Sequence, residues 1–210
     1  MERVRVRRTG EADGAYGSGM DDKQHSISSL LAAAAARAVP VVRGVDERQL
    51  GGPTPCSGYS VRELLDHFFD VVVNFTRLGG KKPSAFAEKP DYLGTSDWRE
   101  RFADEVDRLV SAWGAPGAEE GTTGAMHQPA RTVGCMALLD LTVHAWDLAR
   151  ATGQEYVPDP AGVATLAAVI DELAPAARDA GMFDEPVHTA ADPSPFEELL
   201  AATGRDPYWS

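Results

Sequence analysis

Apolar residues recur at spacings of three and four along most of the chain, and this period is typical of α-helices. No segment of the sequence alternates apolar and polar residues in the way that a half-buried strand does. The pattern predicts six helices, at residues 26–45, 60–78, 96–113, 132–152, 159–173 and 194–204. We therefore expect an all-α protein, a four-helix bundle with one or two additional short helices.

Capping residues mark several helix boundaries. Ser60 and Glu63 form a capping box at the start of the second helix, and Ser194 and Glu197 form another at the start of the last. Gly153 follows the fourth helix, where a left-handed C-terminal residue is common. These signals place the helix ends more firmly than apolar spacing alone.

Two features interrupt the helical pattern. Pro40 lies inside the first helix, and we expect it to bend or break that helix. Residues 114–131 connect the third and fourth helices without a helical period, and connections of this length are often functional. His127 in this connection is a candidate for reaching a site, although a solvated loop histidine is the favoured interpretation.

Residues 1–25 differ from the rest because they are basic, then rich in glycine, and show no period. We interpret them as a disordered N-terminal arm, and residues 26–210 as one helical-bundle metal-binding domain. Met20 is a candidate start of the folded protein. The arm carries four arginines, which raise the less favoured alternative of a nucleic-acid tail: Arg3, Arg5, Arg7 and Arg8.

The net charge of −12 argues against nucleic acid or a membrane surface as a partner, because both repel acidic proteins. No apolar run reaches the length that is usual for a span of the bilayer, and we see no signal-peptide pattern at the start of the sequence. Cys56 and Cys135 are too few for a disulfide framework, so we expect a cytoplasmic protein. Cys56 has no basic neighbour in the local sequence, which favours an inert thiol.

The second helix carries a histidine on or beside its apolar face. His67 shares a stripe with Leu64, Val71 and Asn74 at spacings of three and four. The simplest interpretation is a core histidine bonded to a backbone carbonyl. The alternative is a metal ligand that acts together with residues of a facing helix.

The fourth helix carries Asp140 and His144 at i and i+4, with Cβ atoms about 6 Å apart, so both side chains can reach one cation. An intrahelical Asp–His pair is the alternative. With His67 they would supply three ligands and leave one position open, as in catalytic zinc sites. Asp147 is a candidate to orient His144 from behind, or else pairs with Arg150 on the surface.

Three stretches resemble a known superfamily: PTPCSGYSVRELLDHF at residues 53–68, DLTVHAWDLARATGQ at 140–154 and ATGRDPYW at 202–209. The chain is similar, over about residues 26–210, to the DinB-like, mycothiol-dependent maleylpyruvate isomerase superfamily. The ending resembles that of its short actinobacterial metal-binding members. Two positions depart from the family pattern, since Asp140 stands where Glu is usual and Tyr59 where Trp is usual.

The resemblance implies a DinB-like four-helix bundle that holds a divalent metal ion, zinc first and nickel as the alternative. It assigns the ion to His67, Asp140 and His144. It also implies mycothiol as a possible cosubstrate in S-transfer or isomerisation. The chain lacks the C-terminal substrate domain of the full-length isomerase, so we do not expect maleylpyruvate isomerisation itself.

Three functional hypotheses follow. The first is a metal-dependent transferase or isomerase whose partners are a small-molecule thiol and an electrophilic substrate. The second is a non-catalytic metal-binding bundle with a structural or sensing role. The third is a bundle without a metal, in which Asp140 simply bonds a histidine. The sequence does not identify a general acid or base, and a homodimer through helix faces stays open.

Overall fold

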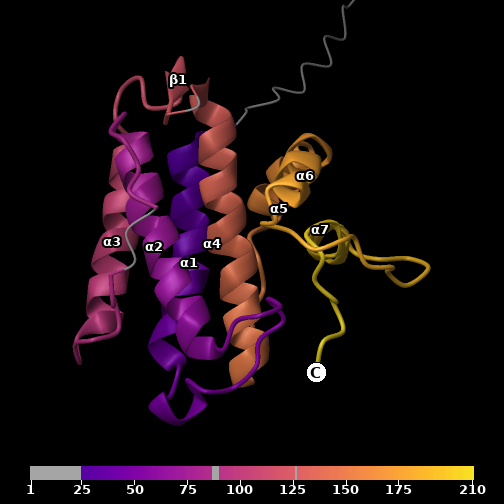
Figure 1. Ribbon diagram of the computed structural model, residues 1–210. Helices are drawn as coiled ribbons and strands as arrows, with labels where there is room; N and C mark the ends of the chain where they lie inside the picture. The colour runs from indigo at the N-terminus through magenta and orange to yellow at the C-terminus, as the bar shows by residue number, and fades with distance from the viewer. Residues whose placement is uncertain (1–24, 87–89, 126) are drawn as a thin grey trace, which may run out of the picture.

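A computed structural model describes residues 25–86, 90–125 and 127–210 of the chain. Four long helices form a bundle: α1 (Ile27–Gly44), α2 (Val61–Gly79), α3 (Trp98–Trp113) and α4 (Ala130–Thr152) (Figure 1). α1 and α2 each pack against both α3 and α4. The all-α four-helix bundle is thereby confirmed, while the predicted N-terminal arm lies outside the described residues apart from His25.

Contacts at one end of the bundle fix the direction of its helices. Glu119 in the connection after α3 accepts a hydrogen bond from the backbone N–H of Ile27 and pairs with Arg131 near the start of α4. Thr123 donates to the carbonyl of Leu78 at the end of α2. The starts of α1 and α4 therefore share an end with the finishes of α2 and α3, so α2 and α4 are antiparallel neighbours.

The connection between α3 and α4 contains a small β-hairpin. Strands β1 (Thr122–Thr123) and β2 (Gln128–Pro129) pair antiparallel. Two-residue strands are too short to leave an alternating pattern, which explains why none was predicted. A short 3₁₀ helix, η1 (Glu47–Gln49), precedes α2.

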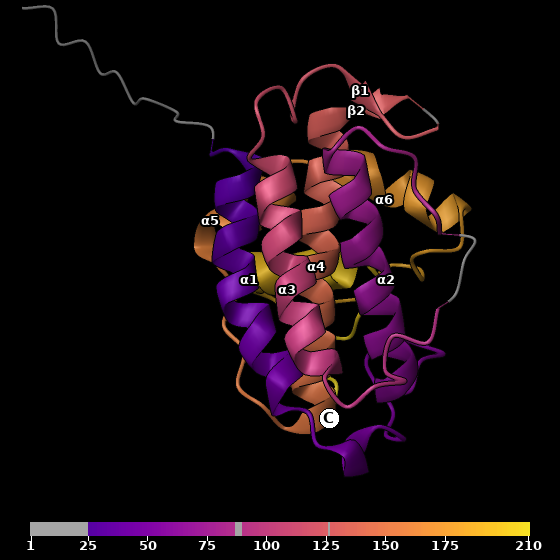
Figure 2. The same ribbon diagram turned by 90° about the vertical axis from the view of Figure 1, so that its left-hand side faces the viewer.

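Three short helices cover the outer side of α4: α5 (Pro160–Ala167), α6 (Ile170–Asp179) and α7 (Pro195–Ala202). Figures 1 and 2 agree that they lie beyond α4, on the side away from α3. The single helix predicted from residue 159 is wrong, because the chain bends by 69° between α5 and α6. No glycine or proline stands at the bend, so the sequence pattern did not indicate it.

The predicted caps are present. Ser60 and Glu63 form a complete capping box at α2, as do Ser194 and Glu197 at α7. Gly153 ends α4 with φ of 70°. Pro40, however, does not break α1, and we attribute this to its exposed position, where the carbonyl that loses its partner can face solvent.

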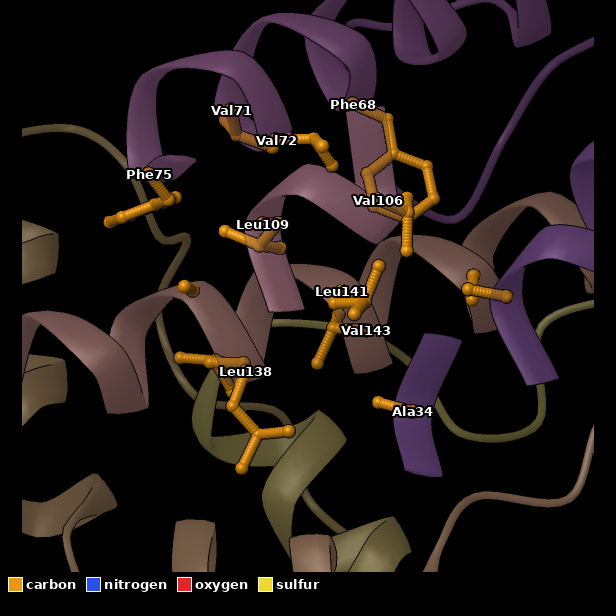
Figure 3. Packing of buried hydrophobic residues seen from close by; sticks show 14 of the residues in the cluster. Ala34, Phe68, Val71, Val72, Phe75, Val106, Leu109, Leu138, Leu141 and Val143 are labelled. Atoms are coloured by element: carbon orange, nitrogen blue, oxygen red, sulfur yellow. The ribbon is translucent and has the colours of Figure 1, made fainter. Parts of the chain in front are cut away.

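The core lies between the four long helices (Figure 3). Phe68 of α2, Val106 and Leu109 of α3, and Leu138 and Leu141 of α4 are all almost fully buried. α4 is buried around most of its circumference, because the bundle covers one side and α5–α7 cover the other. Polar side chains on α4 are therefore removed from water and require partners.

By length and composition, α1 is apolar enough to cross a membrane, although the sequence pattern did not predict this. The helices α5 and α6 meet the same criteria only when they are taken together as one bent pair. Core helices meet the same criteria. α1 buries Leu30, Leu31 and Val42 against its neighbours, and we interpret it as a core helix of the bundle.

Candidate metal centre

His67 and Asp140 each lie beside His144 at the seam between α2 and α4. The ring centroids of His67 and His144 lie 5.0 Å apart, edge to face. His144 Nε2 lies 3.8 Å from Asp140 Oδ1. His144 is buried, whereas His67 is half-buried and the Asp140 side chain is 27% exposed. The seam is therefore open on the side of Asp140.

The seam position follows from the helical period of α2. Phe68 is fully buried and packs against Phe102 of α3, so it faces the centre of the bundle. His67 precedes Phe68 by one residue and is rotated about 100° from it around the helix axis. This rotation moves His67 from the core to the edge of the α2–α4 contact, where His144 meets it.

The separation of Asp140 and His144 is informative. At 3.8 Å, Nε2 and Oδ1 are too far apart for a hydrogen bond, so a simple bonded Asp–His pair is not what the structure contains. Two ligands about 2.1 Å from one tetrahedral ion stand about 3.4 Å apart. The observed distance needs only a small adjustment to match that geometry.

Asp147 determines how the His144 ring is presented. Its side chain is fully buried, and its Oδ2 lies 3.1 Å from His144 Nδ1. A carboxylate at this nitrogen favours the tautomer with the proton on Nδ1, which leaves the lone pair on Nε2 toward Asp140. The alternative partner, Arg150, is exposed and donates to the carbonyl of Trp209 instead.

Arg205 is a member of this centre that the sequence analysis missed. It lies 58 positions beyond Asp147 and is only 6% exposed. Its Nη2 lies 3.3 Å from Asp147 Oδ2 and 3.2 Å from Cys56 Sγ. The available signal was the ATGRDPYW stretch, which the resemblance singled out without giving its arginine a role.

Cys56 reaches the centre from the loop before α2. Thr54 holds this loop by donating to the carbonyls of Cys56 and Tyr59. Burial raises the pKa of the Cys56 thiol to about 11, although the nearby Arg205 guanidinium acts in the opposite direction. The thiol is therefore protonated at neutral pH, in line with the inert thiol that the sequence indicated.

Two groups of candidate ligands thus share His144. The first is the α2–α4 site, which comprises His67, Asp140 and His144. The second is the Cys56 cluster, in which ligand atoms of Cys56, His144 and Asp147 all lie within 4.8 Å of one another. They use opposite nitrogens of the same imidazole, since Nε2 faces Asp140 and Nδ1 faces Asp147.

The electrostatics of the α2–α4 site favour a neutral imidazole. Burial, with a contribution from the neighbouring His144, lowers the pKa of His67 to about 4. Burial raises the pKa of the Asp140 carboxyl. Tyr59 stacks on His67 with ring centroids 5.4 Å apart and covers its outer face. His67 therefore keeps a free lone pair at neutral pH, as a metal ligand requires.

The connection between α3 and α4 does not contribute to this centre. His127 is exposed in the β-hairpin, which is tied to Leu78 at the far end of α2. Leu78 lies eleven residues beyond His67, or about 16 Å along the helix. The favoured interpretation of His127 as a solvated loop histidine is therefore confirmed, and the alternative that it reaches the open side of the site is wrong.

Comparisons with known proteins agree with this architecture. The family described as the mycothiol maleylpyruvate isomerase N-terminal domain matches residues 31–149, which include His67, Asp140 and His144. Two uncharacterized proteins of Mycobacterium tuberculosis, MT0763 and Rv0738, are each 32% identical over 163 residues, or 75% of this chain and 85% of theirs. No solved structure matches significantly. The chain belongs to the family of the mycothiol maleylpyruvate isomerase N-terminal domain.

Proposed function

We propose that the protein is a metal-dependent enzyme that uses a low-molecular-weight thiol of the mycothiol type. The enzyme would either transfer the sulfur of this thiol to a small electrophile or isomerise the electrophile. The observation that carries this proposal is the His144 ring, whose Nδ1 faces Asp147 and whose Nε2 faces Asp140 beside the His67 ring. The mycothiol-related family supports the choice of thiol.

His67, Asp140 and His144 would hold the ion, with zinc as the first choice and nickel as the second. When bound, the ion would keep a coordinated thiol in its thiolate form at neutral pH. Asp147 holds the proton on His144 Nδ1, and Tyr59 shields the outer face of His67. The partly exposed Asp140 marks the side from which a thiol would enter.

With a chlorinated electrophile, the S-transfer step is a substitution. The thiolate sulfur forms a bond to carbon, the carbon–chlorine bond breaks, and chloride leaves with the bonding electrons. The thiol proton goes to solvent. We assign no residue of this chain as a general acid or base, because the substitution requires none.

Two measurements test the proposal. Protein purified without an affinity tag should contain about one zinc or nickel ion per chain by elemental analysis. With mycothiol and a chlorinated bimane, it should form the thioether faster than the uncatalysed reaction. His67→Ala and His144→Ala should each abolish both results. His127→Ala is the matched control and should change neither, since this histidine lies in the distant hairpin.

A non-catalytic metal-binding bundle is the second candidate. Asp140 favours it, because the family's usual Glu is one methylene longer and reaches further toward an ion. In that case the protein should bind its ion and unfold at a lower temperature after chelation, yet show no thioether formation with a panel of electrophiles. Either function suits a reducing cytoplasm, in which Cys56 and Cys135 stay free as they are here.

A further inference from the structure

The Cys56 cluster and the α2–α4 site compete for one histidine. By proximity alone, Cys56, His144 and Asp147 could hold an ion, and a thiolate sulfur is a strong zinc ligand. An ion bound by the Cys56 cluster would need a lone pair on His144 Nδ1. The imidazole would then no longer be available as a ligand beside Asp140. The protein therefore needs a feature that directs the ion to one face of the imidazole.

Arg205 lies where an ion of the Cys56 cluster would have to sit. Its Nη2 lies 3.2 Å from Cys56 Sγ and 3.3 Å from Asp147 Oδ2, so one cationic group already contacts two of the three members. Its other terminal nitrogen donates to the carbonyl of Thr203. A second cation beside this buried guanidinium would meet strong repulsion, because water that could screen the charges is excluded.

On the other face of His144, the charge of Arg205 acts on Asp140 and His67 from a distance, but its direct contacts are with Cys56 and Asp147. Among the described residues, Asp140 forms no ion pair with an arginine or a lysine, and its contact of 3.8 Å is with His144. Its carboxylate thus stays available for a cation. Asp147, by contrast, accepts from His144 and Arg205 through the same oxygen, Oδ2.

We propose that Arg205 is a positioning residue that selects the ligand set: its guanidinium fills the place of a cation in the Cys56 cluster and leaves only the face toward His67 and Asp140 for the ion. This inference rests on the proposed function, because it assumes that His144 is a ligand. It assigns the C-terminal segment a role in the centre, although that segment lies outside the matched residues 31–149.

Cobalt(II) tests the proposal, since it replaces zinc in such sites and shows an intense near-ultraviolet band when a thiolate ligates it. Wild-type protein should bind cobalt without this band, and Cys56→Ser should leave its spectrum and affinity unchanged. Arg205→Ala should gain the band, and the double variant with Cys56→Ser should lose it again. A wild-type spectrum with a Cys56-dependent thiolate band would overturn the proposal, as would an Arg205→Ala spectrum identical to the wild type.

Two further variants separate this role from simple support of the fold. Arg205→Lys should resemble the wild type, because the contact with Asp147 uses a single nitrogen and an ammonium group can make it. Arg150→Ala is the matched control: Arg150 also ties α4 to the C-terminal segment, through Trp209, but does not touch His144 or Asp147. A thiolate band in Arg150→Ala would overturn the proposal.

Should Arg205→Ala fail to fold, alkylation of Cys56 in the wild type remains decisive. Cobalt should leave the alkylation rate of Cys56 unchanged, and protection of about tenfold or more would overturn the proposal. A different result would contradict the proposed function: wild-type protein that binds no cobalt at all. A Cys56-dependent band that then appears only in Arg205→Ala would still support the exclusion of the ion by Arg205.

Discussion

The two ring nitrogens of His144 face two different carboxylates. Asp140 stands four residues before it and Asp147 three residues after it, so one helix supplies both. The buried Asp147 holds one nitrogen as a hydrogen-bond donor, and the partly exposed Asp140 meets the other at a distance that suits a shared ion. One helix thereby orients the ring and leaves its Nε2 toward Asp140, as the proposed role of His144 as a ligand requires.

Asp147→Asn should weaken zinc binding by about 10–100-fold, because the neutral amide no longer fixes the proton on Nδ1 of the histidine. Competition with a chromogenic chelator would measure the change. Asp104→Asn is the control, since Asp104 is exposed on α3, and it should leave the affinity unaltered. Equal affinities for all three proteins would show that Asp147 does not act through His144.

The pH dependence of Cys56 follows from its raised pKa. Because its pKa is about 11 instead of 9.0, the folded protein keeps the thiol proton between these values while the unfolded chain releases it. This group's contribution to stability is therefore complete below pH 9 and is lost as the pH rises toward 11. Alkylation of Cys56 in a Cys135→Ser background should show a rate midpoint near pH 11. The same protein in urea should show one near 9, and a folded-state midpoint at or below 9 would contradict the burial of this thiol.

Residue spacing anticipates the parts of this centre that one helix carries. Asp140, His144 and Asp147 lie on one side of α4, and the helical period alone brings them within reach of one another. Arg205 comes from a segment 58 residues away from Asp147, and no local period connects the two. The position of Arg205 depends on the path by which the chain returns across α4. This path is visible only in the folded structure.

At the scale of elements, the sequence predicted the four long helices and several helix caps, but missed the β1–β2 hairpin and the bend between α5 and α6. Capping boxes are local, so Ser60 and Ser194 mark real helix starts. The bend between α5 and α6 has no local marker, and the apolar stripe continues through it, with Leu166 before it and Ile170 after it both buried. We attribute the bend to tertiary packing and not to propensity, because α5 contacts α1 and α4 whereas α6 contacts α5 and α7.

Gly134 is a test of the packing between α4 and its neighbours. A Cβ at this position would lie 2.8 Å from Ile27 Cγ2 of α1 and 3.1 Å from the Trp113 ring of α3. Overpacking costs about 1–3 kcal/mol, and the better helix propensity of alanine offsets up to about 1 kcal/mol of that. Gly134→Ala should therefore lower the free energy of unfolding in urea by about 1 kcal/mol.

Gly51→Ala is the matched control for this substitution. No atom lies within 4 Å of a Cβ at Gly51. Its free energy of unfolding should stay within about 0.5 kcal/mol of the wild type, as is usual for surface substitutions. Should Gly134→Ala be as stable as Gly51→Ala, α1 and α4 would have room to separate, and the close approach of the two helices would be wrong.

At the scale of the whole molecule, the bundle and its C-terminal cover depend on one another. α5–α7 lie on the side of α4 that the other three long helices leave open (Figure 1), where α5 contacts α4 and α1, and α6 and α7 contact α5. Trp146 of α4 packs against Phe196 of α7, and Arg205 neutralises the buried Asp147. The cover thus protects the apolar side of α4 and balances a charge that the bundle alone would leave unpaired.

Two truncations separate these contributions. A chain that ends at Gly153 lacks the whole cover and exposes the apolar side of α4, so it should self-associate on size-exclusion chromatography.

A chain that ends at Thr203 keeps α7 but loses Arg205. It should remain a folded protein of the wild-type size by chromatography and circular dichroism. Its free energy of unfolding should fall by about 3–5 kcal/mol, because Asp147 stays buried without its cation. If the chain that ends at Thr203 is as stable as the wild type, Arg205 adds nothing beyond the packing of the helices. If the shorter chain keeps the wild-type size and stability, α4 does not need its cover.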